Sequence, residues 1–166
     1  DLGYLPIRVK ALEEGTLCPI KVPMLTIINT HKDFYWLPNF LETILSNSLW
    51  KPMTSATIAF SYKKLLTKWA LATDKDNVGF VDFQAHDFSM RGLTGLDAVI
   101  GSGLAFAAVS MGSDSLPVIK ASQHYYDETT TPVYSVRASE HSQMTAGGVE
   151  GEFDIYKNLL TKFPDG

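Results

Sequence analysis

The strongest constraint on the fold is the alternation of strand-like and helix-like segments from residue 80 onward. The strand-like segments are short and apolar, whereas the others repeat apolar residues at helical spacing. In chain order, the alternating segments are Phe80–Ala85, Leu96–Leu104, Ala107–Met111, Leu116–Tyr126, Val133–Val136 and Glu152–Phe163. Because repeated βα units form parallel sheets, this order predicts an α/β fold.

The length of the chain limits how much of such a fold it can form. A closed eight-stranded barrel usually needs about 250 residues, whereas this sequence has 166. The alternation therefore predicts either a parallel sheet or a partial (β/α) barrel, in which residues 80–166 form the first βα units. A fragment of a longer chain is the simplest interpretation.

Residues 1–79 show a different pattern, which predicts an α+β region that precedes the barrel. Leu5–Ala11 and Met24–Ile28 are strand-like and are expected to form a hairpin or adjacent edge strands.

Helical spacing begins at Trp36, after which apolar residues recur every three or four positions. Proline interrupts helices, so Pro52 is expected to end this first helix. Thr54 is a good N-cap for a second, longer helix, which the polar run from Thr73 ends.

Composition and charge argue against several classes of function. A net charge of -4 without a Lys/Arg cluster argues against nucleic-acid binding. The apolar run Leu104–Val109 is far too short to span a membrane, and the N-terminal residues lack a signal-peptide pattern. The single cysteine, Cys18, excludes an internal disulfide, and no His or Cys spacing predicts a metal site. These features predict a globular protein of the cytoplasm.

Polar motifs accompany the ends of the three strand-like segments. His86–Gly92 follows the first, Gly112–Asp114 follows the second, and Tyr134–Ser142 begins within the third. Since parallel strands end at one edge of a sheet, where α/β folds place active sites, these side chains are expected to collect there. Together they supply an aromatic ring, a guanidinium, a carboxylate, a hydroxyl and an imidazole.

Two residues of the first motif are candidate binding residues. Phe88 is suited to stack on a flat, electron-poor ring, although a lone aromatic at a strand end more often belongs to the core. Arg91 is suited to hold a phosphate or carboxylate through two hydrogen bonds, beside a glycine that allows close approach. Its alternative role is an ordinary surface ion pair with Asp87 or Asp97.

The other motifs supply three more candidates, each with a structural alternative. Asp114 is suited to accept a hydrogen bond from a substrate, or to cap the helix that begins near Leu116. Ser135 is a phosphate or amide donor, or a strand-edge hydroxyl. His141, beside Glu140, is a nucleophile that accepts a phosphoryl group, or a histidine packed at a helix start.

These three motifs, in this order and at this spacing, resemble those of the nicotinamide phosphoribosyltransferase family. Segments before residue 80 are also similar to the region that precedes the barrel in that family, namely Asn29–Thr30, Tyr35–Leu37 and Glu42–Leu45. The resemblance implies the central part of a longer chain, with a barrel of the type II phosphoribosyltransferase kind.

The resemblance also implies a role for each candidate residue. Phe88 would stack on the nicotinamide ring, and Arg91 would bind the base and the phosphate end of the nucleotide. Asp114 would hold the amide and take part in catalysis, while Ser135 would line the amide side of the pocket. His141 would be the catalytic histidine that ATP phosphorylates.

The implied reaction joins nicotinamide to phosphoribosyl pyrophosphate, giving nicotinamide mononucleotide and pyrophosphate for NAD biosynthesis and salvage. Mg²⁺ would accompany the pyrophosphate, ATP would stimulate the reaction, and the full-length enzyme would be a homodimer. The isolated chain is expected to be inactive. Two alternatives remain open. One is a nicotinate phosphoribosyltransferase, against which Asp114 argues because it would repel a carboxylate. The other is a non-catalytic binding or scaffold fragment.

Overall fold

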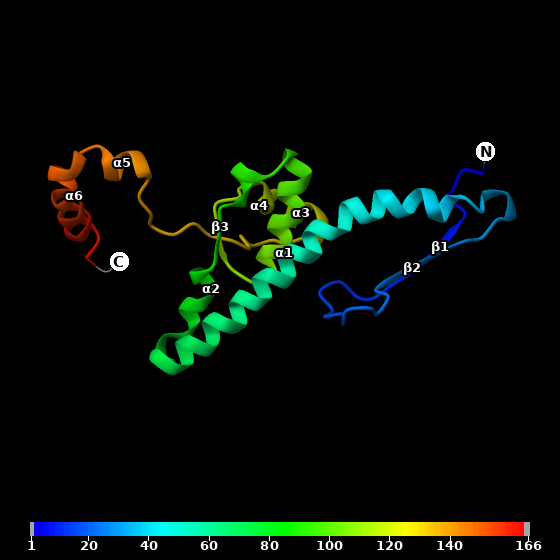
Figure 1. The fold of residues 1–166 in the computed structure, drawn as a ribbon, viewed down its shortest axis with the longest axis horizontal. Coiled ribbons are helices and arrows are strands. Elements are labelled where there is room, and N and C mark those ends of the chain that lie inside the picture. Colours follow the sequence, from blue (N-terminus) through cyan, green and yellow to red (C-terminus); the bar gives the residue numbers. More distant parts are fainter. Residues whose placement is uncertain (1, 165–166) are drawn as a thin grey trace. The chain divides into compact units, whose positions relative to one another are not determined.

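The computed structural model describes residues 2–164 and divides the chain into two compact units, which meet in sequence between Tyr134 and Ser135. The first unit contains strands β1 to β4 and helices α1 to α4, and the second contains α5 and α6 (Figure 1). The first unit mixes helices and strands, as the predicted α/β class requires. The partial barrel and the boundary between residues 79 and 80 stay predictions.

The N-terminal residues form an antiparallel strand pair, as predicted. β1 (Ile7–Ala11) pairs with β2 (Leu25–Asn29) in a register that sets Ile7 opposite Asn29. These two strands form a sheet of their own, and most side chains of β1 are exposed. The short 3-10 helix η1 (Lys32–Phe34) then leads to the first long helix.

A single helix, α1 (Leu37–Thr73), replaces the two helices predicted on either side of Pro52. Proline removes one backbone hydrogen bond and crowds the preceding turn, which bends a helix without always ending it. The Pro52 ring lies against Gly101, where a Cβ atom would come 3.1 Å from the Pro52 Cγ. Because a glycine faces the ring, the helix packs through this point, and Figure 1 shows that α1 bends. The predicted end at Pro52 and N-cap at Thr54 are wrong, whereas the predicted end near Thr73 is confirmed.

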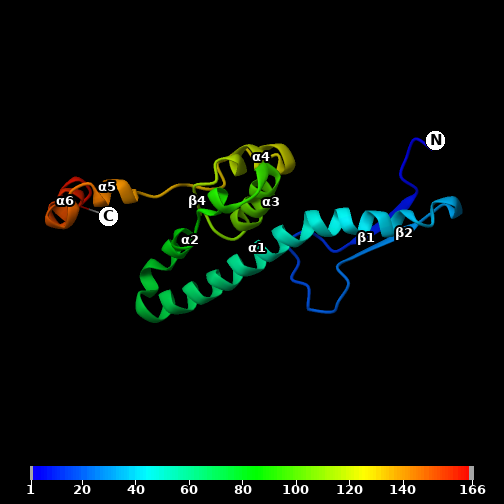
Figure 2. The same ribbon diagram turned by 45° about the horizontal axis from the view of Figure 1, so that its top comes forward.

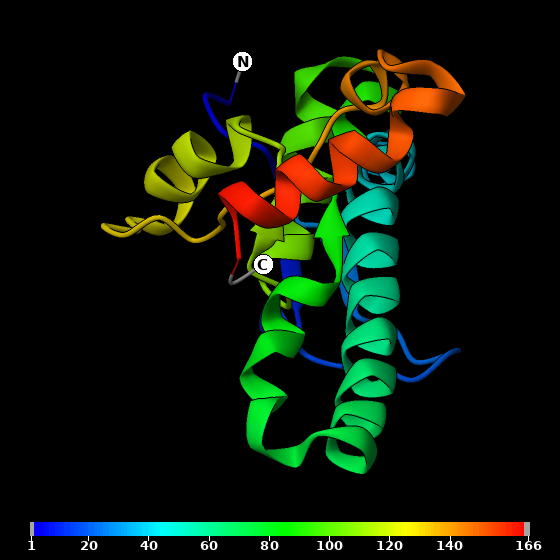
Figure 3. The same cartoon turned by 90° about the vertical axis from the view of Figure 1, so that its left-hand side faces the viewer.

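The segment Phe80–Ala85, predicted as a strand, is mostly helical. The 3-10 helix η2 (Lys75–Phe80) leads into α2 (Val81–Gln84), and both run back beside the end of α1 (Figures 1 and 3). The hydroxyl of Ser110 donates to the carbonyl oxygen of Ala85 at 2.7 Å. Tertiary contacts of this kind satisfy the backbone, so the apolar pattern does not produce a strand here.

Two short parallel strands follow. β3 (His86–Asp87) pairs with β4 (Gly112–Ser113), with His86 opposite Gly112. Gly112 also forms an isolated parallel bridge with Tyr134. Parallel pairing is thus present, but the two paired strands begin directly after the segments predicted as strands, and each has only two residues.

The strand predicted over Ala107–Met111 is wrong, and the one over Val133–Val136 is reduced to the bridge at Tyr134. Residues 108–110 complete the last turn of the preceding helix, because the N–H groups of Val109 and Ser110 donate to the carbonyl oxygen of Phe106. Strand pairing therefore begins only at β4.

Both helices predicted between the strands are confirmed. The 3-10 helix η3 (Ser89–Gly92) and α3 (Gly95–Ala107) connect β3 to β4, and α4 (Pro117–Tyr126) follows β4. The order of short strands and helices after residue 85 therefore follows the predicted alternation.

The core of the first unit lies where α3 packs between α1 and α4 (Figure 2). Gly103 of α3 faces Val118 of α4 so closely that a Cβ atom at Gly103 would come 2.3 Å from the Val118 Cγ2. The hydroxyl oxygens of Ser55 in α1 and Ser102 in α3 lie 2.7 Å apart and share a hydrogen bond. The buried apolar residues come from these helices and adjoining segments: Leu37, Ala59, Val81, Val99, Val118, Ala121 and Val133.

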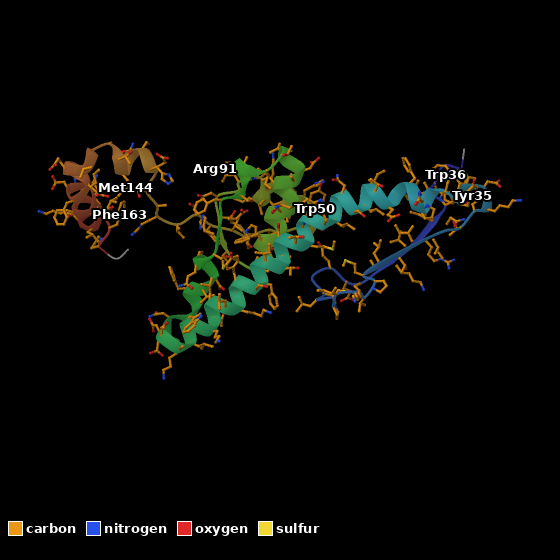
Figure 4. All side chains as sticks on the ribbon, in the orientation of Figure 1. Tyr35, Trp36, Trp50, Arg91, Met144 and Phe163 are labelled. Carbon is orange, nitrogen blue, oxygen red and sulfur yellow. The ribbon has the colours of Figure 1, made fainter. Side chains whose placement is uncertain are left out.

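The second unit contains α5 (His141–Thr145) and α6 (Gly148–Lys162). The helix predicted over Glu152–Phe163 is confirmed, although it begins earlier. The guanidinium carbon of Arg137 lies 5.1 Å from the ring centroid of Phe163, which is labelled in Figure 4. A cation over an aromatic ring stabilises this unit modestly.

Candidate functional site

The ends of β3 and β4 lie side by side, and the residues that follow them form the candidate site. The N–H group of Asp114 donates to the carbonyl oxygen of Asp87 at 3.0 Å, which continues the parallel pairing one residue beyond β4. Phe88 and Asp114 therefore follow neighbouring strand ends. This is the edge of a parallel sheet at which α/β proteins bind ligands.

Phe88 and Asp114 both contact His86. Nε2 of His86 lies 3.2 Å from Oδ1 of Asp114. The rings of His86 and Phe88 have centroids 4.4 Å apart and planes inclined by 31°. The His86 side chain is 9% exposed, whereas the Asp114 side chain is 44% exposed and Phe88 is 53% exposed. In this His86–Phe88–Asp114 cluster, the imidazole is buried and the other two groups are accessible to a ligand.

Asp87, between His86 and Phe88 in sequence, is buried and shapes the backbone of the site. Its Oδ1 accepts a hydrogen bond of 2.8 Å from the N–H group of Ser89, which fixes the turn that carries Phe88. Its Oδ2 has no hydrogen-bond partner among residues 2–164 and faces Gly103 of α3. Asp87 therefore holds the turn and does not reach the accessible face of the cluster.

Arg91 lies in η3, after β3, and its side chain is exposed (Figure 4). The salt bridges of the described residues do not include Arg91, so the alternative pairing with Asp87 or Asp97 is not found. An exposed guanidinium can bind an anionic group by two parallel hydrogen bonds.

The alternative role of Asp114 as a helix cap is not found either. The N-cap of α4 is Leu116, and no side chain caps it. Ser113 instead accepts the N–H of Ser115 through its hydroxyl oxygen at 3.0 Å. The Asp114 side chain thus points to His86 and the surface.

Ser135 and His141 belong to the second unit, and both are exposed. His141 is the first residue of α5 and its side chain is 98% exposed, with Nδ1 3.7 Å from Oε1 of Glu140. Hydrogen bonds from the hydroxyl and the N–H group of Ser142 hold the pKa of Glu140 below its ordinary value of 4.5. The imidazole is accessible, with a carboxylate beside it, and the alternative of a packed histidine is not found.

Comparisons with known proteins extend over the whole chain. It is 42% identical over 167 residues to a nicotinamide phosphoribosyltransferase of Acinetobacter baylyi, covering 100% of this chain and 33% of that protein. It is 36% identical to the nicotinamide phosphoribosyltransferase of Xanthomonas campestris over 163 residues, and 35% identical to that of Mycoplasma pneumoniae over 164 residues.

The chain is homologous to the nicotinamide phosphoribosyltransferases. The alignments with the Xanthomonas campestris and Mycoplasma pneumoniae proteins each cover 97% of this chain and 34% of the relative. The chain therefore spans about a third of the length of the curated relatives it matches. No family model matches the chain.

Nothing in the sequence alone assigns a role to His86, although it is the first residue of the motif His86–Gly92. The signal that could have found it is the glycine at position 112, which stands opposite a large side chain in the parallel pair. A glycine in a strand often marks a place where another group approaches closely. That signal has meaning only when the register of the two strands is known.

Two properties of the described residues concern metals and membranes. No three His, Cys, Asp or Glu side chains within residues 2–164 are grouped closely enough to hold a metal ion. In the same range, no helix combines the length and apolar character needed to cross a bilayer.

Proposed function

We propose that this chain is part of an enzyme that transfers the phosphoribosyl group of phosphoribosyl pyrophosphate to nicotinamide, giving nicotinamide mononucleotide and pyrophosphate. The observation that carries this proposal is homology over the whole chain to proteins named for nicotinamide phosphoribosyl transfer. The reaction supplies NAD biosynthesis and salvage.

The His86–Phe88–Asp114 cluster supports the choice of substrate. Phe88 presents an accessible aromatic face, on which an electron-poor pyridine ring would stack. Asp114 presents a half-exposed carboxylate, which would accept a hydrogen bond from the carboxamide N–H of nicotinamide. The same charge would repel the carboxylate of nicotinate, so this residue is proposed to select nicotinamide.

The proposed reaction is attack of the pyridine nitrogen on C1 of the ribose as pyrophosphate leaves. Positive charge develops at the ribose in the transition state, so the enzyme acts by positioning and by electrostatic stabilisation. Phe88 and Asp114 would orient the base, and the exposed guanidinium of Arg91 would offset phosphate charge.

A phosphohistidine at His141 is proposed as the source of ATP stimulation. Its imidazole is accessible and has the Glu140 carboxylate 3.7 Å away, which suits a phosphoryl acceptor. Ser135 is proposed to line the amide side of the nicotinamide pocket.

Mg²⁺ is proposed to enter with the pyrophosphate. Magnesium usually keeps several waters and binds through substrate phosphates with one or two carboxylates, so an all-protein cage is not required. On the family resemblance alone, we further propose a type II phosphoribosyltransferase barrel, a cytoplasmic homodimer, and no activity for residues 1–166 by themselves.

The test uses the full-length protein that contains this sequence, supplied with phosphoribosyl pyrophosphate, Mg²⁺ and ATP. Nicotinamide and nicotinate compete in one reaction, and mass spectrometry identifies the mononucleotide. Nicotinamide mononucleotide is expected to form, with ATP hydrolysis that is lost in His141→Ala. A matched control is His124→Ala, since His124 lies on α4 and has no proposed role.

The other outcomes are equally informative. Nicotinate mononucleotide as the main product would support the proposed phosphoribosyl transfer but overturn the selectivity assigned to Asp114. Absence of both products would favour the non-catalytic alternative. If His141→Ala still makes nicotinamide mononucleotide and hydrolyses ATP at an unchanged rate, only the proposal of a phosphohistidine at His141 is overturned.

A further inference from the structure

We propose that His86 is a positioning residue, which orients the Asp114 carboxylate and supports the Phe88 ring so that both meet nicotinamide in a fixed arrangement. This inference rests on the proposed function and concerns the same site. It is carried by the burial of His86, by its two contacts and by the glycine opposite it.

The burial of the imidazole is the first step. Its two nitrogen atoms are buried and have no hydrogen-bond partner among residues 2–164. A buried polar group without a partner is unfavourable, and such groups concentrate at functional sites. The Asp114 carboxylate, with Oδ1 3.2 Å from Nε2, is within ion-pair distance but is not aligned for a hydrogen bond. A small rotation of this half-exposed carboxylate completes the bond, and active-site hydrogen bonds of this kind tighten when substrate binds.

Phe88 and Gly112 lie against two other sides of the imidazole. Phe88 covers one face at a centroid distance of 4.4 Å. On the Nδ1 side lies Gly112, where a Cβ atom would come 2.8 Å from Nδ1. Gly112 is held by its pairing in the sheet, and the other ring nitrogen, Nε2, faces Asp114.

The chemistry of this contact decides what Asp114 can do. An ionised carboxylate only accepts hydrogen bonds, so we assign the imidazole proton to Nε2. With Nε2 donating to Oδ1, the Asp114 carboxylate is held in a defined orientation, in which it would accept the carboxamide N–H of nicotinamide.

The decisive pair of variants is His86→Asn and His86→Gln in the full-length enzyme. The amide nitrogen of glutamine can occupy the place of Nε2, whereas that of asparagine corresponds to Nδ1 and cannot reach Asp114. In His86→Asn, kcat/KM for nicotinamide is expected to fall about tenfold, which corresponds to the loss of one hydrogen bond to a charged group. His86→Gln is expected to stay within about threefold of the unsubstituted enzyme, and kcat is expected to change less than KM in both variants.

A double-mutant cycle tests whether His86 acts through Asp114. In an Asp114→Ala background, the further change His86→Asn is expected to alter nicotinamide kcat/KM by less than about twofold, because the group it orients is gone. A variant that merely misfolds would lose activity in both backgrounds. Circular dichroism and thermal unfolding of each variant provide the check on folding.

Each possible outcome either supports or overturns the positioning role of His86. Rescue by glutamine but not asparagine, with loss of the effect in Asp114→Ala, supports it. Equal losses in the two variants, unchanged kinetics in His86→Asn, or an undiminished effect in Asp114→Ala would overturn it while leaving the proposed function intact. If the unsubstituted full-length protein makes no nicotinamide mononucleotide, the proposed function fails, and this inference fails with it.

Discussion

Gly112 stands opposite His86 in the parallel pair of β3 and β4, and a side chain at Gly112 would meet the imidazole. A Cβ atom there would come 2.8 Å from the His86 Nδ1 and 3.0 Å from the carbonyl oxygen of Ala85. One contact belongs to the candidate site and the other to the backbone that carries it. The size of this residue therefore links the stability of the strands to the geometry of the site.

Gly112→Ala is expected to destabilise the protein by about 1–3 kcal/mol, the usual range for forcing an extra carbon into a packed region. Because the imidazole must move, kcat/KM for nicotinamide should also fall. Gly79→Ala is the control, since a Cβ atom at Gly79 meets nothing within 4 Å. Chemical denaturation and steady-state kinetics of the full-length variants measure both effects, and equal behaviour of the two variants would contradict the prediction.

Gly103→Ala is expected to separate α3 from α4. The new Cβ atom would lie 2.3 Å from the Cγ2 of Val118, whose side chain is fully buried and stiff because it is β-branched. A destabilisation of about 1–3 kcal/mol is expected. Adding Val118→Ala should restore part of the stability in denaturation experiments, since it removes the clashing methyl group. If the double variant is less stable than the sum of the single changes predicts, the clash is not the cause.

The hydrogen bond between Ser55 and Ser102 joins α1 to α3 at an oxygen–oxygen distance of 2.7 Å. Ser102 is buried, so removing its partner by Ser55→Ala leaves a buried hydroxyl unsatisfied and should cost about 1 kcal/mol or more. The double change of both serines to alanine should cost less than the sum of the single changes. Strictly additive free energies of unfolding would show that the two hydroxyl groups do not interact.

The sequence predicted the elements whose signals are local. The helices α3 and α4 follow from apolar spacing, and the pairing of β3 with β4 follows from the alternation of strands and helices. The predictions from the sequence failed where a residue far away in the chain decides the local structure. Pro52 does not end α1 because Gly101 accommodates its ring, and the strand expected before β3 is replaced by helix where Ser110 binds its backbone.

The candidate site was likewise predictable from the sequence only in part. That Phe88 and Asp114 approach one another could be predicted, because parallel strands end at the same edge of a sheet. The contacts of His86 could not, because they depend on the register that sets Gly112 opposite it. Which side of the strand His86 faces is fixed by pairing and not by the motif alone.

Asp114→Asn is expected to reduce the preference for nicotinamide over nicotinate by about tenfold or more, in line with the value of one charge-assisted contact. The change keeps the shape of the side chain but removes the charge that would repel the nicotinate carboxylate. Asp97→Asn in α3 makes the same change of charge at an exposed position and should leave the ratio unaltered. The ratio of kcat/KM values for the two bases is the measurement, and an equal shift in both variants would point to a general charge effect.

Tyr126 at the end of α4 donates its hydroxyl hydrogen to the Glu14 carboxylate, and this hydrogen bond, with burial and the charge of Glu14, raises the pKa of Tyr126 from 10.0 to about 12. Since the folded state favours the neutral phenol, the stabilisation is fully present below pH 10 and is lost as the pH rises through about 12. Carbon-13 NMR of labelled tyrosines, with Tyr126→Phe for assignment, should show this pKa falling in Glu14→Gln. An unchanged titration would mean that Glu14 does not hold the end of α4.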